Sequence, residues 1–96
     1  MYATIRRYRP GAGSKDTGVR AWRALAVFLA QEDGFISCAV LETGDGELTA
    51  ITFFDDAASL AAADRKVEAW LAEQQAGLAR LLVHVTTGEV VAQRGL

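Results

Sequence analysis

Two side chains of this sequence could support acid–base or oxyanion chemistry, His84 and Arg7. Histidine changes charge near neutral pH, so His84 is the natural candidate for a general base, and a guanidinium can bind an oxyanion that develops on a substrate. Arg7 shares strand parity with Ala3 and Ile5, so its guanidinium would point toward the core if those two residues do. Both also have structural interpretations, because Arg7 can extend past the core into solvent and His84 can be a satisfied or interfacial strand residue.

Three aromatic side chains are candidates for the wall of a ligand site. Trp22 and Trp70 lie on the inward stripes of two predicted helices, and Phe53 lies in a β-rich run on the face that the helices are expected to cover. Aromatic walls suit planar ligands, whereas the same residues also serve as ordinary core. The sequence leaves both interpretations open.

Length and composition predict one globular domain, spanning residues 1–96, with 51% apolar and 23% charged residues. Cys38 is the single cysteine, so an intrachain disulfide is excluded, and with only His84 as a companion ligand a metal site is not expected. The longest apolar run, residues 24–30, is too short to span a membrane, and no signal-peptide pattern follows Met1. We therefore expect a cytoplasmic protein with no membrane partner.

Positive charge is concentrated near the N-terminus. Residues 1–23 contain six arginine or lysine residues against one acidic residue, Asp16, whereas the whole chain has a net charge of −2. This asymmetry is typical of an anion site near the first strand, of two copies that dock with opposite charges matched, or of a scattered solvated surface.

The elements that must position these side chains follow an alternating order. A β-rich run over residues 2–9 ends at Pro10-Gly11, residues 11–18 read as a loop, and apolar residues at helical spacing predict a helix over 17–31. Two strands over 35–42 and 47–54 flank Asp45-Gly46, the preferred dipeptide of a two-residue type I′ hairpin.

The second half of the chain continues the alternation. The carboxylates of Asp55 and Asp56 suit the N-cap of a helix that begins near residue 57 and ends near Gly77. A last strand over 81–87 is followed by a kink or bulge at Gly88. The order βαββαβ predicts an α+β, ferredoxin-like fold, with both helices on one face of a four-stranded antiparallel sheet.

A two-residue hairpin loop would fix which residues share a face of this sheet. The face toward the helices would carry Ile36, Cys38, Val40, Ile51 and Phe53. The opposite face would carry Phe35, Ala39, Leu41, Leu48, Ala50 and Phe54, with Ser37 and Thr52 among them and with Tyr2, Thr4, Arg6 and Tyr8 from the first strand. Because so apolar a face usually marks an interface, we expect a homodimer formed sheet to sheet, the alternative being a monomer with an exposed apolar face.

Three segments, "YATIRRY", "GFISCAV" and above all "LTAITFFDDAASLAAADRKVEAW", resemble the antibiotic-biosynthesis monooxygenase family of small dimeric α/β-barrel proteins. The resemblance implies a pocket between helices and sheet and, in members that are enzymes, cofactor-less oxygenation of electron-rich aromatics such as quinols and anthrones, or haem degradation. The haem-degrading branch uses an asparagine in the first strand and a tryptophan and histidine on the second helix. Those positions fall here at Arg7, Ala63 and Glu73, so the sequence does not match that branch and no cofactor is expected.

Two functions therefore stand at this point. The first is a cofactor-independent monooxygenase-like protein with an apolar pocket for an aromatic or quinone-like metabolite, and the second is a non-catalytic dimeric ligand-binding or assembly module of the same fold. RNA-recognition domains share this topology, but "ELTAITFF" lacks their basic, glycine-containing aromatic signature, so nucleic acid is not an expected partner.

Overall fold

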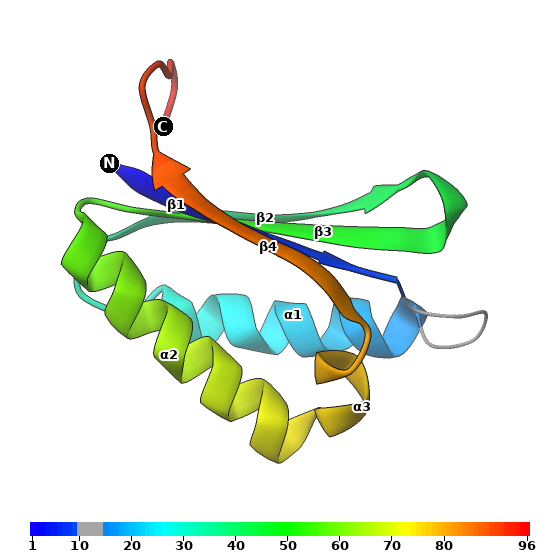
Figure 1. The fold of residues 1–96 in the computed structure, drawn as a ribbon. Helices are drawn as coiled ribbons and strands as arrows, with labels where there is room; N and C mark the ends of the chain where they lie inside the picture. Colours follow the sequence, from blue (N-terminus) through cyan, green and yellow to red (C-terminus); the bar gives the residue numbers. More distant parts are fainter. Residues whose placement is uncertain (10–14) are drawn as a thin grey trace.

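The computed structural model describes residues 1–9 and 15–96, which form one antiparallel sheet with the helices on one face (Figure 1). In chain order the elements are β1 (Tyr2–Tyr8), α1 (Lys15–Leu29), β2 (Phe35–Thr43), the 3-10 turn η1 (Gly44–Gly46), β3 (Glu47–Phe54), α2 (Ala57–Gln74), α3 (Ala76–Ala79) and β4 (Leu82–Glu89). The strand order is β2-β3-β1-β4. The ferredoxin-like α+β fold is thereby confirmed.

The local signals located the elements to within a few residues. Helix α1 begins two residues before Thr17, and α2 ends at Gln74, with Gly77 in the short helix α3. The predicted turn at Pro10-Gly11 lies outside the described residues. The irregularity of the last strand falls not at Gly88 but between His84 and Leu82, where the register with β1 shifts.

Helix α2 begins where the acidic pair predicted it would. Asp56 is the N-cap, and its Oδ1 accepts a hydrogen bond from the Ser59 backbone N–H at 2.7 Å. The hydrogen bonds from Ser59 hold the pKa of the Asp56 carboxyl below its usual value. The capping interpretation is confirmed for Asp56, whereas the Asp55 backbone N–H donates to the Gly34 carbonyl at 2.8 Å and closes the loop before the helix.

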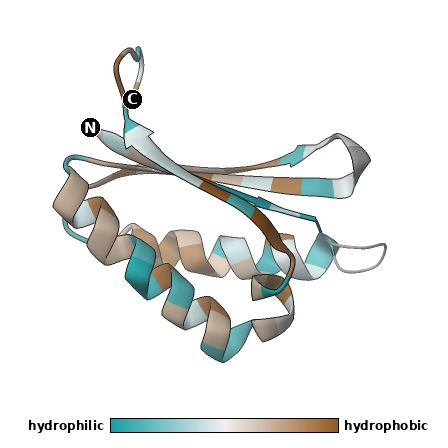
Figure 2. Cartoon of the chain, viewed as in Figure 1, coloured by the Kyte–Doolittle hydropathy of each residue, from teal (hydrophilic) through white to brown (hydrophobic). Residues whose placement is uncertain are grey.

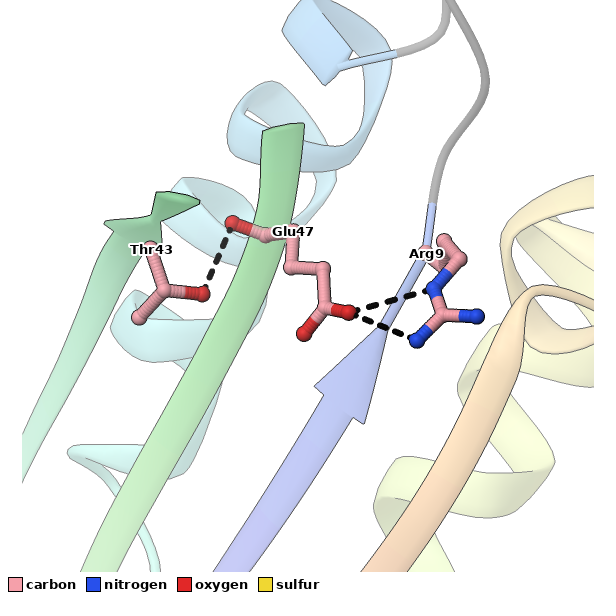
Figure 3. Close-up of polar contacts among 3 residues, drawn as sticks. All are labelled: Arg9, Thr43 and Glu47. Atoms are coloured by element: carbon pink, nitrogen blue, oxygen red, sulfur yellow. Dashed lines mark hydrogen bonds and ion pairs between the residues drawn. The ribbon is translucent and has the colours of Figure 1, made fainter. Parts of the chain in front are cut away.

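The β2–β3 hairpin has a three-residue turn rather than the predicted two-residue loop. Gly44–Gly46 forms the 3-10 turn η1, Gly46 has a φ of +75°, and Thr43 pairs with Glu47. Figure 3 shows that Glu47 is contacted from both sides. Arg9 donates to the Glu47 side-chain oxygen Oε1 from Nε at 3.1 Å and from Nη2 at 2.8 Å. The Thr43 hydroxyl donates to the Glu47 backbone carbonyl at 3.3 Å. One extra turn residue shifts the pairing register by one.

That shift reverses the predicted faces of β3 and β1, because a one-residue slip sends every side chain of a strand to the other side of the sheet. The side chains toward the helices are Thr4, Arg6, Tyr8, Leu48, Ala50, Thr52 and Phe54, all buried. Ile5 pairs with Ile51 on the face away from the helices, and Arg7 pairs with Thr49 there. The predictions that Arg7 and Phe53 face the helices, and that Arg6 and Tyr8 face a partner, are therefore wrong.

The core lies between the sheet and the two long helices. Trp22, Leu25 and Leu29 of α1 are each no more than 1% exposed. Helix α2 contributes Leu60, Ala63, Val67 and Leu71, as its apolar spacing predicted, while Trp70 is partly buried beside this cluster. Cys38 and Val40 of β2 also pack against it, on the face predicted for them.

The face of the sheet away from the helices, which we call the open face, mixes apolar and polar side chains. It carries Ala3, Ile5, Ala39, Leu41, Ile51 and Phe53 in its middle, together with Arg7, Thr43, Glu47, Thr49, His84 and Thr86. Ile5 and Leu41 are 37% and 44% exposed. At the sheet edge, β4 shows hydrophobic segments in Figure 2, and its Val83 and Val85 are exposed.

None of the helices within residues 1–9 and 15–96 is long and apolar enough to cross a membrane.

Candidate functional site

A buried ion pair joins the middle of α2 to strand β1. The Arg6 side chain is 2% exposed, and its Nη2 lies 3.1 Å from Oδ1 of Asp64, whose side chain is 18% exposed. The Thr4 hydroxyl donates to the other carboxylate oxygen, Oδ2, at 2.7 Å and lies 3.2 Å from the Thr87 hydroxyl of β4. Both oxygens of Asp64 are thus engaged by side chains of β1, and Thr4 links this contact to the adjacent strand β4.

Strand alternation explains why these polar groups meet in the interior. Thr4 and Arg6 are two residues apart on β1 and therefore point to the same side of the sheet. Asp64 lies four residues after Leu60 and three before Val67, so it projects from the buried stripe of α2. An acidic residue on an apolar helical stripe needs a buried partner, which Arg6 supplies.

Polar atoms close to this pair lack partners. Within the described part of the chain, Arg6 Nη1, Tyr8 Oη, Trp22 Nε1 and Thr52 Oγ1 are buried and have no hydrogen-bond partner. Leaving a buried polar group unpaired costs about 1–3 kcal/mol, so most such groups in native proteins are paired with protein or water. The guanidinium nitrogen can only donate, so an acceptor oxygen of a water or ligand would complete Arg6, whereas the Tyr8 and Thr52 hydroxyls can either donate or accept.

Tyr8 connects Arg6 to Trp22 inside the core. The Tyr8 and Trp22 rings pack edge to face with centroids 6.2 Å apart. Burial raises the pKa of Tyr8 to about 12, and the nearby Arg6 charge and Trp22 side chain oppose this only in part. Tyr8 is therefore a neutral phenol at physiological pH and can donate its hydroxyl hydrogen.

Two surface grooves approach this interior from opposite sides. The Asp64 groove, of about 290 Å³, lies between α2 and strands β1 and β4, and its lining includes Tyr2, Leu60, Asp64 and Thr87. The Trp22 groove, of about 340 Å³, lies between α1 and strands β2 and β3, and its lining includes Val19, Trp22, Ala26, Cys38, Val40 and Leu48. The ion pair is reached from the first groove, through Asp64.

The structure separates the two tryptophans that were predicted as ligand walls. Trp22 lines the Trp22 groove, whereas Trp70 lines another groove, between α1 and α2, together with Ala24 and Gln74. Phe53, the third candidate, lies on the open face opposite Ala3. The three aromatic candidates therefore do not form one wall.

Arg7 and His84, the predicted catalytic residues, are cross-strand neighbours on the open face. His84 Nε2 is hydrogen-bonded to the Thr86 hydroxyl on the same strand. They lie together, but on the side of the sheet opposite to the buried ion pair. A chemical role for either residue stays a prediction.

Sequence reasoning missed Arg6 and Asp64 as site residues. The signal for Asp64 was available, since the residue interrupts an otherwise apolar stripe of α2. The signal for Arg6 was the alternation of Thr4, Arg6 and Tyr8, a polar face of β1 that was assigned to the wrong side of the sheet. Their pairing could not be predicted without the hairpin register.

Comparison with known proteins now places the chain among relatives. A sequence model of the antibiotic biosynthesis monooxygenase family matches residues 1–77. Among curated proteins, none matches this chain. Solved structures do resemble it: Rv0793 from Mycobacterium tuberculosis is 22% identical, with 98% of each chain covered and a TM-score of 0.77.

Two further structures carry functional names. SnoaB, a cofactor-independent oxygenase from Streptomyces nogalater, is 20% identical over 99% of this chain and 95% of its own, with a TM-score of 0.69. A mutant of MhuD with two manganese protoporphyrin IX molecules bound per active site is 17% identical over 99% of both chains, with a TM-score of 0.77. At such identities the similarity shows the fold alone, whereas the match to residues 1–77 shows the family. The chain belongs to the antibiotic biosynthesis monooxygenase family.

Proposed function

We propose that this protein is a small cofactor-independent monooxygenase that binds an aromatic or quinone-like metabolite between α2 and the sheet. The observation that supports the proposal most is the buried Arg6 guanidinium, which has Nη1 without a partner among the described residues and a compensating carboxylate that lines a groove. Family membership and the cofactor-independent activity named for SnoaB point the same way.

The proposed chemistry uses Arg6 as the oxyanion-binding group, in place of Arg7. An anthrone-type substrate that loses a proton becomes an electron-rich enolate, and a buried cation stabilises the negative oxygen far more than water does. The activated ring carbon then takes one oxygen atom of O2, and the second leaves as water with the two hydrogens of the original methylene group. Substrate electrons reduce the oxygen, so the reaction needs no cofactor.

Asp64 and Tyr8 have supporting roles in this proposal. Asp64 fixes the guanidinium through Nη2, which leaves Nη1 for the substrate, and Thr4 holds the carboxylate in place. Tyr8 adds a neutral hydroxyl donor beside Arg6. A site with a held cation and a neutral donor is preorganised for charge that appears during the reaction.

A second copy of the chain is the proposed partner, with the open faces in contact. The exposed apolar side chains of Ile5 and Leu41, in a sheet whose other face already covers the core, support this arrangement. Arg7, His84 and Phe53 would then belong to the dimer interface. Replacing Leu41 by lysine should give a monomer by light scattering, whereas Val27→Lys, a change at a 69% exposed position on α1, should leave the dimer intact.

A non-catalytic dimeric ligand-binding or assembly module is the second candidate. It is favoured by the dense interior, where Tyr8, Leu25 and Phe54 are fully buried, and by the modest volumes of the grooves. In that case an aromatic ligand would raise the melting temperature of the protein without being converted.

Oxygen uptake with an anthrone substrate tests the proposal. We expect consumption above the protein-free rate, and about a 100-fold lower kcat/KM in Arg6→Met, the usual effect of removing an oxyanion donor. Arg9→Met is the matched control, because Arg9 is a solvent-exposed arginine of the same segment, paired with Glu47. Equal rates for wild type and Arg6→Met would exclude the assigned role, and ligand binding without oxygen uptake would favour the second candidate.

A further inference from the structure

A groove in the helical layer, which we call the helix groove, lies between the first half of α1 and the end of α2, two helices on the same face of the sheet (Figure 1). Its lining consists of Thr17, Arg20, Ala21 and Ala24 on one side and Trp70, Gln74 and Gln75 on the other. A volume of about 350 Å³ is near the lower end of the range for small-molecule sites, so it suits one or two rings. None of these residues lines the Asp64 groove, so the two grooves are separate.

Trp70 gives the helix groove an aromatic wall that the core covers only in part. It precedes the buried residue Leu71 of α2 and is itself partly buried against the core cluster. Across the groove, α1 presents Ala21 and Ala24, whose small side chains leave room opposite the indole. The accessible part of the indole can therefore stack against a planar ring.

The charge of the lining indicates what such a ring should carry. Arg20 is exposed and is the charged residue of the lining. Within residues 1–9 and 15–96, Arg20 takes part in no ion pair; the cations that do so are Arg6, Arg9, Lys15 and Lys66. Thr17 and Gln74 add neutral groups that can donate hydrogen bonds.

The other grooves of this layer differ from the helix groove in charge. The Asp64 groove contains Asp64 and Glu68, and the Trp22 groove contains Glu42, so carboxylates already stand beside their cations. The helix groove has the arginine without an acidic residue in its lining. Since a guanidinium can hold a carboxylate by two parallel hydrogen bonds, the missing acid fits a ligand carboxylate.

We propose that the helix groove binds a small aromatic carboxylate, with the ring against Trp70 and the carboxylate on Arg20. The negative charge distinguishes this ligand from the quinone-like metabolite assigned to the Arg6 site, and its place between two helices distinguishes it from a site between helix and sheet. Neither proposal depends on the other, because the two grooves have no residue in common.

The indole N–H signals provide a direct test, because the chain has two tryptophans. Two-dimensional 1H–15N NMR of the full-length protein would follow both signals during titration. We expect 2-naphthoate to move the Trp70 signal and to leave in place the signal of Trp22, whose side chain is 1% exposed. The neutral 2-naphthamide should bind about fivefold more weakly, which corresponds to about 1 kcal/mol, the upper end for an exposed ion pair. Acetate, which has the carboxylate but no ring, should leave both signals in place at the same concentration.

Two pairs of variants separate the charge from the space. Arg20→Gln should lower the affinity for 2-naphthoate to that for 2-naphthamide, whereas Arg23→Gln, the same change at an exposed position of α1 that lines the Trp22 groove, should alter it less than about twofold. Ala24→Leu fills the helix groove and should weaken both ligands about tenfold. Ala72→Leu, at an exposed position of α2 outside the lining, is the control for added bulk.

Three results would overturn the proposal. They are a Trp70 signal that 2-naphthoate does not move, equal affinity for 2-naphthoate and 2-naphthamide, and equal losses in Arg20→Gln and Arg23→Gln, which would indicate diffuse attraction to a basic helix. Binding that is lost in Arg6→Met but kept in Arg20→Gln would place 2-naphthoate at the Arg6 site instead and would also contradict it. Oxygen uptake with anthrone is measured separately, so failure of either proposal leaves the other standing.

Discussion

Replacing Asp64 should destabilise the protein more than replacing its partner Arg6. Removing one member of a buried ion pair costs about 3–5 kcal/mol when the charge left behind is fully buried. Asp64→Ala leaves the Arg6 guanidinium, 2% exposed, without compensation, so we expect the full penalty. Arg6→Met leaves Asp64, which is 18% exposed and keeps the hydrogen bond from Thr4, so we expect about 1–3 kcal/mol.

The double variant completes the cycle. Arg6→Met combined with Asp64→Ala removes both charges, so no charge is left buried without a partner, and its loss of stability should be smaller than the sum of the two single losses. Urea unfolding at pH 7 and one fixed protein concentration measures all three, with Arg9→Met as the control for an exposed pair, expected to cost less than about 1 kcal/mol. Additive losses, or a larger loss for Arg6→Met than for Asp64→Ala, would refute the description of a coupled buried pair.

Three further predictions concern the stability of the fold that surrounds the site. Gly34→Ala should destabilise the fold more than Gly46→Ala, as measured by the midpoints of urea unfolding. Both glycines have a positive φ, but only at Gly34 would an added Cβ meet another side chain, that of Ser59 at 2.9 Å. Asp56→Ala should lower the melting temperature at pH 7 but not at pH 2, since a lowered carboxyl pKa gives stability that is lost as the pH falls through the folded pKa; an unchanged difference at pH 2 would contradict this. The raised pKa of Tyr8 contributes stability that is fully present below pH 10.0 and is lost as the pH rises through about 12. In Tyr8→Phe the stability should therefore decline less over this pH range, and the ultraviolet absorbance change of phenolate formation near pH 12 should be absent.

The elements of this fold are predictable because each is encoded locally. Asp56 fixes the start of α2 through a hydrogen bond to Ser59, three residues away, and the apolar spacing from Leu60 to Leu71 fixes its buried side. Both signals lie within one helix. The βαββαβ order and the family resemblance depend on such signals; the structure confirms the order, and the match over residues 1–77 confirms the family.

The site was less predictable because it depends on pairing between strands. The turn at Gly44–Gly46 was located correctly, but its length differed by one residue, and that difference exchanges Arg6 for Arg7 as the inward arginine. No local signal separates a two-residue from a three-residue turn in this segment. The contact between Arg6 and Asp64 joins residues 58 positions apart, so only the assembled fold reveals it.

A crystal structure with anthrone bound under anaerobic conditions is the most direct test of the central claim, that Arg6 on the helix side of the sheet holds the substrate oxygen. We predict anthrone between α2 and the sheet, with its oxygen at hydrogen-bond distance, about 3 Å, from Arg6 Nη1. Anthrone bound instead on the open face beside Arg7 and His84 would contradict the account.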